Sequence, residues 1–335
     1  MQRIKIIAEI AQAHDGSLGI LHSYIDALAE SGVDAIKFQT HIAEAESSTY
    51  EQFRVNFSYV DKTRYDYWKR MEFSLDQWKE IKAHCDSKGI EFMSSPFSNL
   101  AVDWLEDVGI MQYKIGSGEV SNLLLLERIA KTHKPVILSS GLSDWSELEH
   151  AIEFLKEREI EVSVLQCTTA YPCPPEKWGL NVIQELKDKF KLKTGYSDHS
   201  GTPAACIAAA SLGAEILEFH VVFDKRMFGP DASSSLTIDE VKYMVQAVRQ
   251  IEIAKTNPIQ KEISATHNEL KIMFGKSLAI NKDLKIGHIL TVDDLEGKKP
   301  GDKGIPAKDF KSVVGKKLIV DKNKWDFLKH EELEK

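Results

Sequence analysis

Two histidines lie in short stretches that are typical of neighbouring strand ends. His199 lies in "GYSDHSG" and His220 lies in "EILEFHVVFD". Adjacent strands are about 5 Å apart, so two imidazoles at matching strand ends can hold one divalent cation. Imidazole suits Mn, Fe, Co or Zn, and nearby carboxylates would complete the ligands. The alternative is that one or both rings make hydrogen bonds inside the core, and the pairing of the two favours the metal.

Two lysines lie inside apolar runs that read as strands. Lys37 belongs to "DAIKFQT" and Lys114 to "MQYKIGSG". Because lysine is costly to bury unless it is paired, each needs an anionic partner. One partner is a bound phosphate or carboxylate, which the small residues of "KIGSGE" would let backbone N–H groups approach. The alternative partners are two carboxylates of the chain itself, Glu9 and Glu119.

Short β-type runs alternate with helical runs over the first 255 residues. The β-type runs are 4–10, 34–40, 90–97, 111–118, 135–141, 162–172, 193–200 and 215–222. One helical run, 19–32, spaces a set of apolar residues on one face, namely Ile20, Leu21, Tyr24, Ile25 and Leu28. Strand–helix units repeated over about 250 residues predict an α/β fold, a (β/α)8 TIM barrel. A doubly wound open sheet is the alternative. The absence of a G-x-G-x-x-G motif after the first run disfavours it.

Active sites of such barrels are built from residues at the carboxyl ends of the strands. Here those ends supply lysines, histidines, carboxylates and hydroxyls: Glu9, Lys37, Gln39, Ser94, Ser95, Lys114, Ser117, Glu119, Thr168, Thr169, Tyr171, Ser197, Asp198, His199, Glu218 and His220. The long, aromatic segment 41–89 is predicted to cover one end of the barrel. The sequence therefore predicts an active site rather than a plain scaffold.

The character of the chain changes after residue 255. We predict a barrel domain over 1–255, a linker with some helix over 256–275 and a small β-rich domain over 276–335. A domain of about sixty residues buries little surface, so we expect it to dock on another part.

Composition and charge argue against a nucleic-acid-binding, membrane-spanning or secreted protein. The formal net charge of −8 argues against a nucleic-acid partner. No apolar run approaches the length of a membrane span, and the start does not resemble a signal peptide. The four cysteines contain no C-x-x-C pair, and free thiols are expected of a chain without a secretion signal. These features predict a cytoplasmic protein with no membrane partner.

Seven short motifs, taken in order, resemble the sialic acid synthase family. They are "AEIAQAHDGS", "IKFQT", "SSPFS", "KIGSGE", "CTTAYP", "GYSDHS" and "LEFH" followed by "GPD". The resemblance implies an enzyme that condenses phosphoenolpyruvate with an N-acetylated hexosamine and water to make a nonulosonic acid, releasing phosphate. The tail resembles the antifreeze-like (SAF, β-clip) domain of these synthases. In the family that domain reaches over the barrel of a partner chain, which implies a domain-swapped homodimer.

The resemblance also implies roles for individual residues. His199 and His220 would hold the metal, normally Mn²⁺, with Mg²⁺ or Co²⁺ possible. Phosphoenolpyruvate would contact Lys37, Ser95, Lys114, Ser117, Thr169, Tyr171 and Ser197. The sugar would contact Gln39, Tyr171, Asp231 and Lys299. The catalytic and orienting carboxylates would be Glu9, Glu119 and Glu218, with Glu119 stabilising positive charge at C2 of the enol.

Two departures from the family pattern bear on the substrates. Thr169 stands where some members have asparagine, and Lys299 in "KKPG" stands where arginine is usual. Lysine lacks the planar fork of arginine, so the two are not equivalent in recognising a substrate. Both N-acetylmannosamine and a 2,4-diacetamido-6-deoxy hexose therefore remain candidate acceptors.

Three rival functions remain open from the sequence. A metal-dependent hydrolase on the same barrel would release phosphate without an acceptor, although the usual H-x-H of the first strand is absent. A related phosphoenolpyruvate-dependent synthase would require a phosphorylated aldose. A carbohydrate-binding or scaffold protein would show no turnover and leaves the two lysines unexplained.

Overall fold

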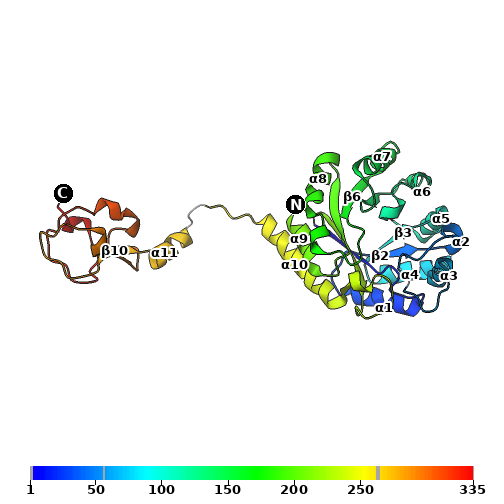
Figure 1. Ribbon diagram of the computed structural model, residues 1–335, viewed down its shortest axis with the longest axis horizontal. Helices are drawn as coiled ribbons and strands as arrows, with labels where there is room; N and C mark the ends of the chain where they lie inside the picture. The colour runs from blue at the N-terminus through cyan, green and yellow to red at the C-terminus, as the bar shows by residue number, and fades with distance from the viewer. Residues whose placement is uncertain (1–2, 56, 262–264, 335) are drawn as a thin grey trace. The chain divides into compact units, whose positions relative to one another are not determined.

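The computed structural model describes residues 3–55, 57–261 and 265–334. The chain divides into two compact units, Met1–Pro258 and Ile259–Lys335. In the described part of the first unit, eight parallel strands pair in chain order and β1 also pairs with β8, while a short ninth strand, β9 (Leu236–Thr237), pairs with the end of β8. This closure confirms the predicted (β/α)8 barrel, and Figure 1 shows the helices arranged around it.

The barrel strands match most of the predicted runs. They are β1 (Lys5–Glu9), β2 (Ala35–Thr40), β3 (Glu91–Pro96), β4 (Tyr113–Ile115), β5 (Val136–Ser139), β6 (Val162–Cys167), β7 (Lys193–Asp198) and β8 (Ile216–Val222). The predictions were wrong at two ends: β4 stops before Gly116 and β6 stops at Cys167. After β4 the chain turns directly into the 3-10 helix η1 (Ser117–Glu119), which carries the polar end of "KIGSGE" out of the sheet.

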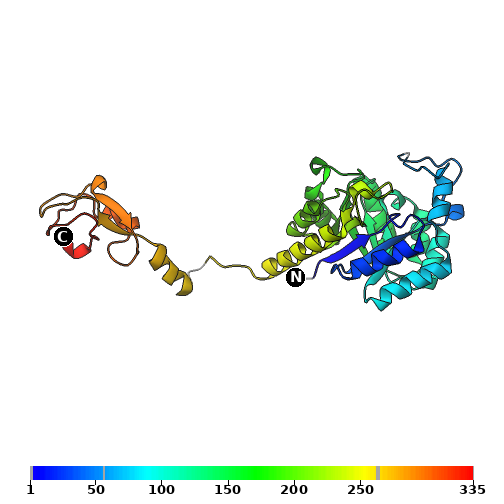
Figure 2. The same ribbon diagram turned by 90° about the horizontal axis from the view of Figure 1, so that it is seen from below.

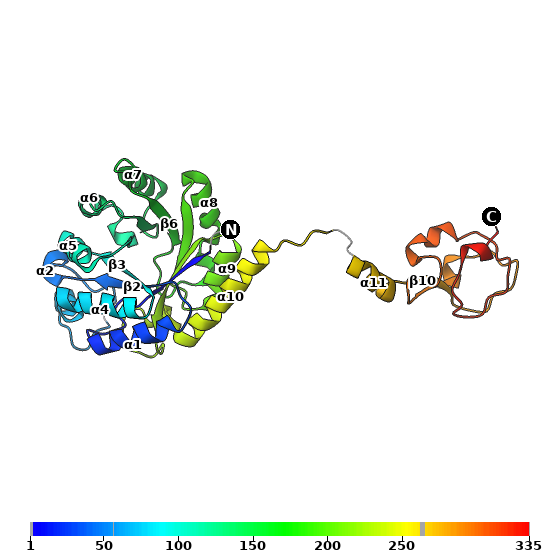
Figure 3. The same ribbon diagram turned by 180° about the vertical axis from the view of Figure 1, so that it is seen from behind.

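Helices cover the outside of the barrel. They include α1 (Leu18–Ala29), α4 (Leu75–Ser87), α5 (Asn99–Val108), α6 (Leu123–Ala130), α7 (Trp145–Lys156), α8 (Leu180–Phe190), α9 (Pro203–Ser211) and α10 (Ile238–Thr256). Figure 3 shows α1, α4 and α10 on the side opposite α7. Within α1, Leu21, Tyr24, Ile25 and Leu28 are buried as predicted. Ile20, predicted to share their face, is instead 38% exposed, because it lies about 100° around the helix from Leu21, at the edge of the buried face.

The segment between β2 and α4 is the insertion that the sequence predicted. It contains α2 (Ala43–Glu46) and α3 (Arg64–Met71), and Figure 2 shows the chain between them reaching out from the barrel. Its inner side is an apolar cluster of Ala43, Tyr67, Trp68 and Met71, with Phe53, Phe57 and Tyr65 packed against it. Part of the predicted insertion is α4, which packs on α1 and β3 as an ordinary barrel helix.

The second unit is small and mostly irregular. It contains α11 (Ala265–Phe274) and an antiparallel pair, β10 (Ser277–Ile280) and β11 (Leu295–Lys298). Single bridges such as Leu284 to Lys322 tie its loops together. Its core is one cluster of aliphatic residues, namely Leu278, Ile280, Leu284, Leu290, Ile305, Val313, Leu318, Leu328 and Leu333. A core of this size agrees with a domain of low independent stability.

Two further expectations can be compared with the structure. All four cysteines are buried and unpaired. Within the described residues, no helix is both long and apolar enough to span a membrane.

Candidate active site

The barrel interior is filled in layers, and the polar site begins one layer above the apolar core. The apolar layer contains Ile7, Ala35, Met93, Ile137, Leu165 and Ile216, one residue from each of six strands. Because side chains alternate along a strand, residues two positions further on also face the interior. Those residues are Glu9, Lys37, Ser95, Ser139, Cys167 and Glu218. On β7 the corresponding pair is Gly195 and Ser197, and any side chain at Gly195 would collide with the carbonyl of Ile216.

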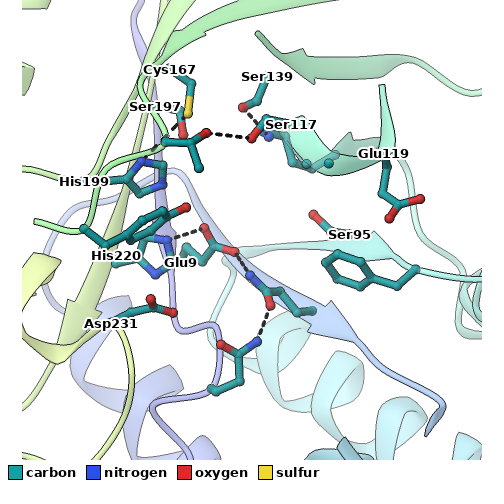
Figure 4. A pocket seen from close by; sticks show the side chains of 18 of the residues that line it. Glu9, Ser95, Ser117, Glu119, Ser139, Cys167, Ser197, His199, His220 and Asp231 are labelled. Atoms are coloured by element: carbon teal, nitrogen blue, oxygen red, sulfur yellow. Dashed lines mark hydrogen bonds and ion pairs between the residues drawn. The ribbon is translucent and has the colours of Figure 1, made fainter. Parts of the chain in front are cut away.

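A cavity of about 400 Å³ opens above this polar layer. Its walls contain fourteen of the fifteen predicted site residues: Glu9, Lys37, Gln39, Ser95, Lys114, Ser117, Glu119, Thr169, Tyr171, Ser197, His199, Glu218, His220 and Asp231. Figure 4 shows His199, His220, Glu9 and Asp231 on one side of the cavity and Ser95 with Glu119 on the other. The volume is typical of small-molecule sites. Lys299 belongs to the second unit.

Three strand-end residues of the broader predicted set do not line the cavity. Ser94 exchanges a hydrogen bond with Thr40, 2.7 Å away. Thr168 donates from its hydroxyl to the carbonyl of Lys177. Asp198 accepts from the backbone and hydroxyl of Ser200, and burial raises its pKa to about 6. The predictions for these three were wrong because each lies at an odd step from its inward-facing neighbours.

Lys37 lies at the centre of the polar floor. Its Nζ donates to Glu9 Oε1 at 2.6 Å and lies 3.7 Å from Glu218 Oε1, and all three side chains are almost fully buried. Burial alone would raise the pKa of Glu9, but Lys37 and His220 hold it well below its usual value. Burial would lower the pKa of Lys37, yet Glu218 and Glu9 raise it. Lys37 is therefore cationic and is already partly paired with carboxylates of the chain. Such pairing was the alternative that the sequence left open.

Lys114 is held more loosely by protein anions. It donates to Ser139 Oγ at 2.7 Å and to the carbonyl of Ile115, and Glu218 Oε1 lies 3.5 Å away. Its nearest carboxylate is thus Glu218, which was not among the two alternative partners, Glu9 and Glu119, that the sequence offered. Burial lowers the pKa of Lys114. Glu218 accepts from Ser197 at 3.0 Å through Oε1, while its buried Oε2 has no partner. An unsatisfied buried carboxylate oxygen and a weakly paired lysine mark a place where a ligand completes the hydrogen bonding.

The two histidines lie together beside Tyr171. Their ring centroids are 5.3 Å apart, and Tyr171 packs on His199 at 4.1 Å. His199 Nδ1 lies 3.0 Å from the carbonyl oxygen of Thr168, which can only accept, so Nε2 keeps its free lone pair. Burial, with His220 nearby, lowers the pKa of His199 to about 3. A neutral imidazole fixed by a second hydrogen bond is the form that binds metals.

Few of the described side chains beside the two histidines are free to coordinate a cation. His220 Nε2 lies 3.3 Å from Glu9 Oε2. The other carboxylate oxygen of Glu9, Oε1, accepts a hydrogen bond from Lys37. Within the described ranges, no group of three or more His, Cys, Asp or Glu side chains is arranged to hold a metal ion. The residues fit a cation bound by two imidazoles, with the remaining positions open to substrate or water oxygens.

The opposite wall carries Glu119 and the hydroxyls of Ser117 and Thr169. Glu119 follows the short β4 on η1, and burial raises its pKa. Ser117 Oγ lies 3.4 Å from Thr169 Oγ1. Gly141 makes room for this pair, since a Cβ there would lie 2.6 Å from the Thr169 hydroxyl. The wall therefore offers two hydroxyls and one carboxylate to a ligand.

Sequence reasoning missed several lining residues, two of them at strand ends and the others outside the strands. The strand-end residues are Ser139 and Cys167, and the others are Gln12, His41, Glu46, Glu51, Arg54, Arg64, Trp68, Phe97 and Leu142. Ser139 and Cys167 could have been found from strand alternation, because they follow Ile137 and Leu165 by two positions. The residues of the insertion carry no such periodic signal.

His41 connects several of these missed residues. Its ring stacks between Trp68, at 3.9 Å, and Phe97, at 4.4 Å. Nδ1 lies 2.6 Å from Glu46 Oε1, and Nε2 lies 3.0 Å from Gln39 Oε1. Gln39 in turn donates to Glu9 Oε1. His41 therefore orients Gln39, which orients Glu9.

Replacing His41 with phenylalanine should separate its aromatic packing from its hydrogen bond to Gln39. The aromatic stack is preserved, but Gln39 loses a partner, so we expect kcat to fall about tenfold with little change in KM for either substrate. His41→Gln, which keeps a polar group, should recover part of the loss. Steady-state kinetics with thermal unfolding is the measurement. A His41→Phe enzyme with unchanged kcat would show that the ring serves packing alone.

Comparisons with known proteins agree with this geometry. Residues 24–260 match the model of the NeuB family, and residues 275–326 match that of the SAF domain. The N,N'-diacetyllegionaminic acid synthase of Campylobacter jejuni is 36% identical over 329 residues, which cover 96% of this chain and 97% of that protein. The human N-acetylneuraminate-9-phosphate synthase is 34% identical over 318 residues, covering 94% and 88%. The crystal structure of the N-acetylneuraminic acid (sialic acid) synthetase from Leptospira borgpetersenii, a citrate complex, has a TM-score of 0.70 and 30% identity, covering 80% of this chain and 90% of that one.

Proposed function

Because this chain belongs to the NeuB family, we propose that it is a nonulosonic acid synthase that condenses phosphoenolpyruvate with an N-acylated hexosamine and water, releasing phosphate. The resemblance to sialic acid synthases, inferred from seven short motifs, is confirmed by the family match. The predicted antifreeze-like tail is confirmed by the match to the SAF domain. The reaction itself is inferred from similar proteins and from the site.

The observation that carries the proposal is the pair of buried lysines below the cavity. Lys37 and Lys114 are fully buried, and hydroxyls of Ser95 and Ser117 lie in the same cavity. Phosphoenolpyruvate carries both a phosphate and a carboxylate, so it needs two cationic anchors that water cannot screen. Within the described residues, Lys114 donates only to neutral oxygens, and its one carboxylate neighbour lies 3.5 Å away, so it can still take an anionic ligand.

The rest of the cavity suits an open-chain sugar above the enol. C3 of phosphoenolpyruvate attacks the acceptor aldehyde, and the electron deficit that develops at C2 faces the carboxylate of Glu119. Water then adds to C2, and the resulting tetrahedral intermediate loses phosphate. Gln39, Tyr171 and Asp231, which line the cavity, would contact the sugar hydroxyls. Glu9 accepts hydrogen bonds from both Lys37 and Gln39.

We also propose that His199 and His220 hold a divalent cation, Mn²⁺ with Mg²⁺ or Co²⁺ as alternatives. The neutral imidazole of His199 and the short separation of the rings support this assignment. When bound there, such a cation would supply Lewis acidity toward the acceptor carbonyl.

The experiment that tests the function uses the purified full chain with phosphoenolpyruvate and Mn²⁺. Three acceptors are supplied separately: N-acetylmannosamine, its 6-phosphate and a 2,4-diacetamido-6-deoxy hexose. We expect acceptor-dependent phosphate release together with a product of the condensed mass. Phosphate release without an acceptor would identify a hydrolase instead. Absence of condensation with every acceptor, from folded and metal-loaded protein, would contradict the synthase assignment.

Assembly and location follow from the same proposal. We propose a homodimer in which the SAF domain of one chain covers the barrel of the other, which would bring Lys299 to a partner's cavity. Exposed apolar side chains on α11, including Met273 and Phe274, support a partner surface. Sedimentation at twice the 37.8 kDa chain mass would agree, and a monomer would contradict it. We further propose a cytoplasmic location, where phosphoenolpyruvate is made.

A further inference from the structure

Arg54 reaches the cavity from the insertion between α2 and α3, far from any strand end. Its Nη2 donates to Asp231 Oδ1 at 2.9 Å, across 177 positions of sequence. Its guanidinium also lies 4.1 Å from the centre of the Tyr171 ring. Tyr171 packs on His199, so the guanidinium, the phenol ring and the imidazole form one column from the mouth of the cavity to its wall. Arg54 therefore contacts two residues that the family pattern assigns to substrate.

The pairing leaves polar atoms directed at a ligand. Only one nitrogen of Arg54 and one side-chain oxygen of Asp231 are used by their mutual hydrogen bond. A guanidinium has five N–H donors, so several remain, and the second carboxylate oxygen of Asp231 remains an acceptor. Donors and an acceptor side by side suit hydroxyl and amide groups. Arg54 is 44% exposed, so a ligand can reach it without any unfolding.

Charges around the mouth distinguish neutral from phosphorylated acceptors. Outside the polar floor, the described residues that line the cavity include two guanidinium groups and four carboxylates, belonging to Arg54, Arg64, Glu46, Glu51, Glu119 and Asp231. Each arginine is matched: Arg54 with Asp231, and Arg64 with Glu51, 3.4 Å away. A phosphate group at the mouth would meet an excess of negative charge and would have to displace a carboxylate from an arginine.

A hexose bound with its aldehyde toward the histidines places its C6 end toward the mouth. We propose that the Arg54–Asp231 pair determines acceptor specificity: it offers hydrogen bonds to an uncharged N-acylated hexosamine, while its internal charge balance leaves no unpaired cation for a phosphate at C6. The inference rests on the proposed function, because it names the class of acceptor that the same site takes. On this inference, anionic groups of the substrates bind at the two buried lysines and not at the mouth of the cavity.

The test compares kcat/KM for N-acetylmannosamine, its 6-phosphate and the 2,4-diacetamido-6-deoxy hexose. We expect the better uncharged acceptor to exceed the 6-phosphate by about tenfold or more. Arg54→Ala should raise KM for that acceptor by about 10- to 100-fold, with KM for phosphoenolpyruvate unchanged. Arg54→Lys should recover little, because lysine lacks the planar fork. Arg128→Ala is the matched control, since Arg128 has similar exposure and pairs with Asp103 on the outside of the barrel.

The outcomes separate this inference from the function on which it rests. Product from the 6-phosphate in preference to both free sugars would leave the synthase assignment intact and overturn the role of Arg54. Loss of turnover in Arg54→Ala with the 6-phosphate alone would also overturn it, because Arg54 would then be a phosphate ligand. No product from any acceptor with the unmodified enzyme would overturn both.

Discussion

Replacing Lys37 with methionine is expected to lower kcat/KM for phosphoenolpyruvate by about 10²- to 10³-fold. Methionine fills a similar volume but removes the cation that lies 2.6 Å from Glu9 and 3.7 Å from Glu218. Phosphoenolpyruvate then loses one of its two anchors, and both carboxylates lose their shared counter-charge. Because Glu9 then remains buried without a lysine beside it, while Glu218 keeps Lys114 at 3.5 Å, the free energy of unfolding should fall by about 3–5 kcal/mol. Steady-state kinetics and chemical denaturation measure the two effects.

A second substitution distinguishes binding from stability. Glu9→Gln in the Lys37→Met background removes one uncompensated charge, so stability should recover in part while activity stays low. Lys5→Ala is the control, because Lys5 pairs with Glu91 at the opposite end of the strands, outside the cavity. Full activity in Lys37→Met would show that the lysine serves only the internal salt bridge.

Removing either imidazole is expected to abolish metal-dependent turnover. The two imidazole rings lie with their centroids 5.3 Å apart. His199→Ala or His220→Ala leaves one of them to bind the ion. Because the proposed site has two protein ligands, the dissociation constant for Mn²⁺ should rise about 100-fold or more, beyond the effect of losing an outer-shell partner. Calorimetric titration of the metal-free protein with Mn²⁺ reports binding independently of turnover. In the unmodified protein, a chelator should remove activity and added Mn²⁺ should restore it.

His150 on α7 supplies the control for this experiment. It is exposed on the outside of the barrel, so His150→Ala should bind Mn²⁺ as the unmodified protein does. Unaltered Mn²⁺ affinity in both His199→Ala and His220→Ala would mean that the rings make only internal hydrogen bonds. That outcome would leave the acceptor carbonyl to be polarised by other groups of the cavity.

Local pattern was enough to predict the barrel and most of its polar floor. A buried strand is a short apolar run, and a lysine or carboxylate within it stands out because burial without a partner is costly. Lys37, Lys114 and Glu218 were found in this way. The sequence could not decide which anion faces each lysine: Glu9 and Glu119 were the alternative partners for the pair, and Lys114 lies 3.5 Å from Glu218.

The mouth of the cavity depends on contacts between distant parts of the chain. Arg54 and Asp231 are separated by 177 positions, and His41 is held between Trp68 and Phe97 from different elements. The insertion that carries Arg54 has no regular hydrophobic period, so nothing in its sequence predicts which way a side chain points. Its geometry is set by the packing of Tyr67, Trp68 and Met71 in the cluster beneath it.

The sequence by itself determined the order of strands and helices, the residues at the strand ends and the family to which they belong. These are short-range properties, because strand alternation and helical period are written in neighbouring residues. Only the tertiary structure decided which strand-end residues face the cavity, how the buried charges pair and which residues of the insertion form the mouth. Those features arise when the closing of the barrel brings β1 against β8, more than 200 positions apart, and no local pattern encodes such distances.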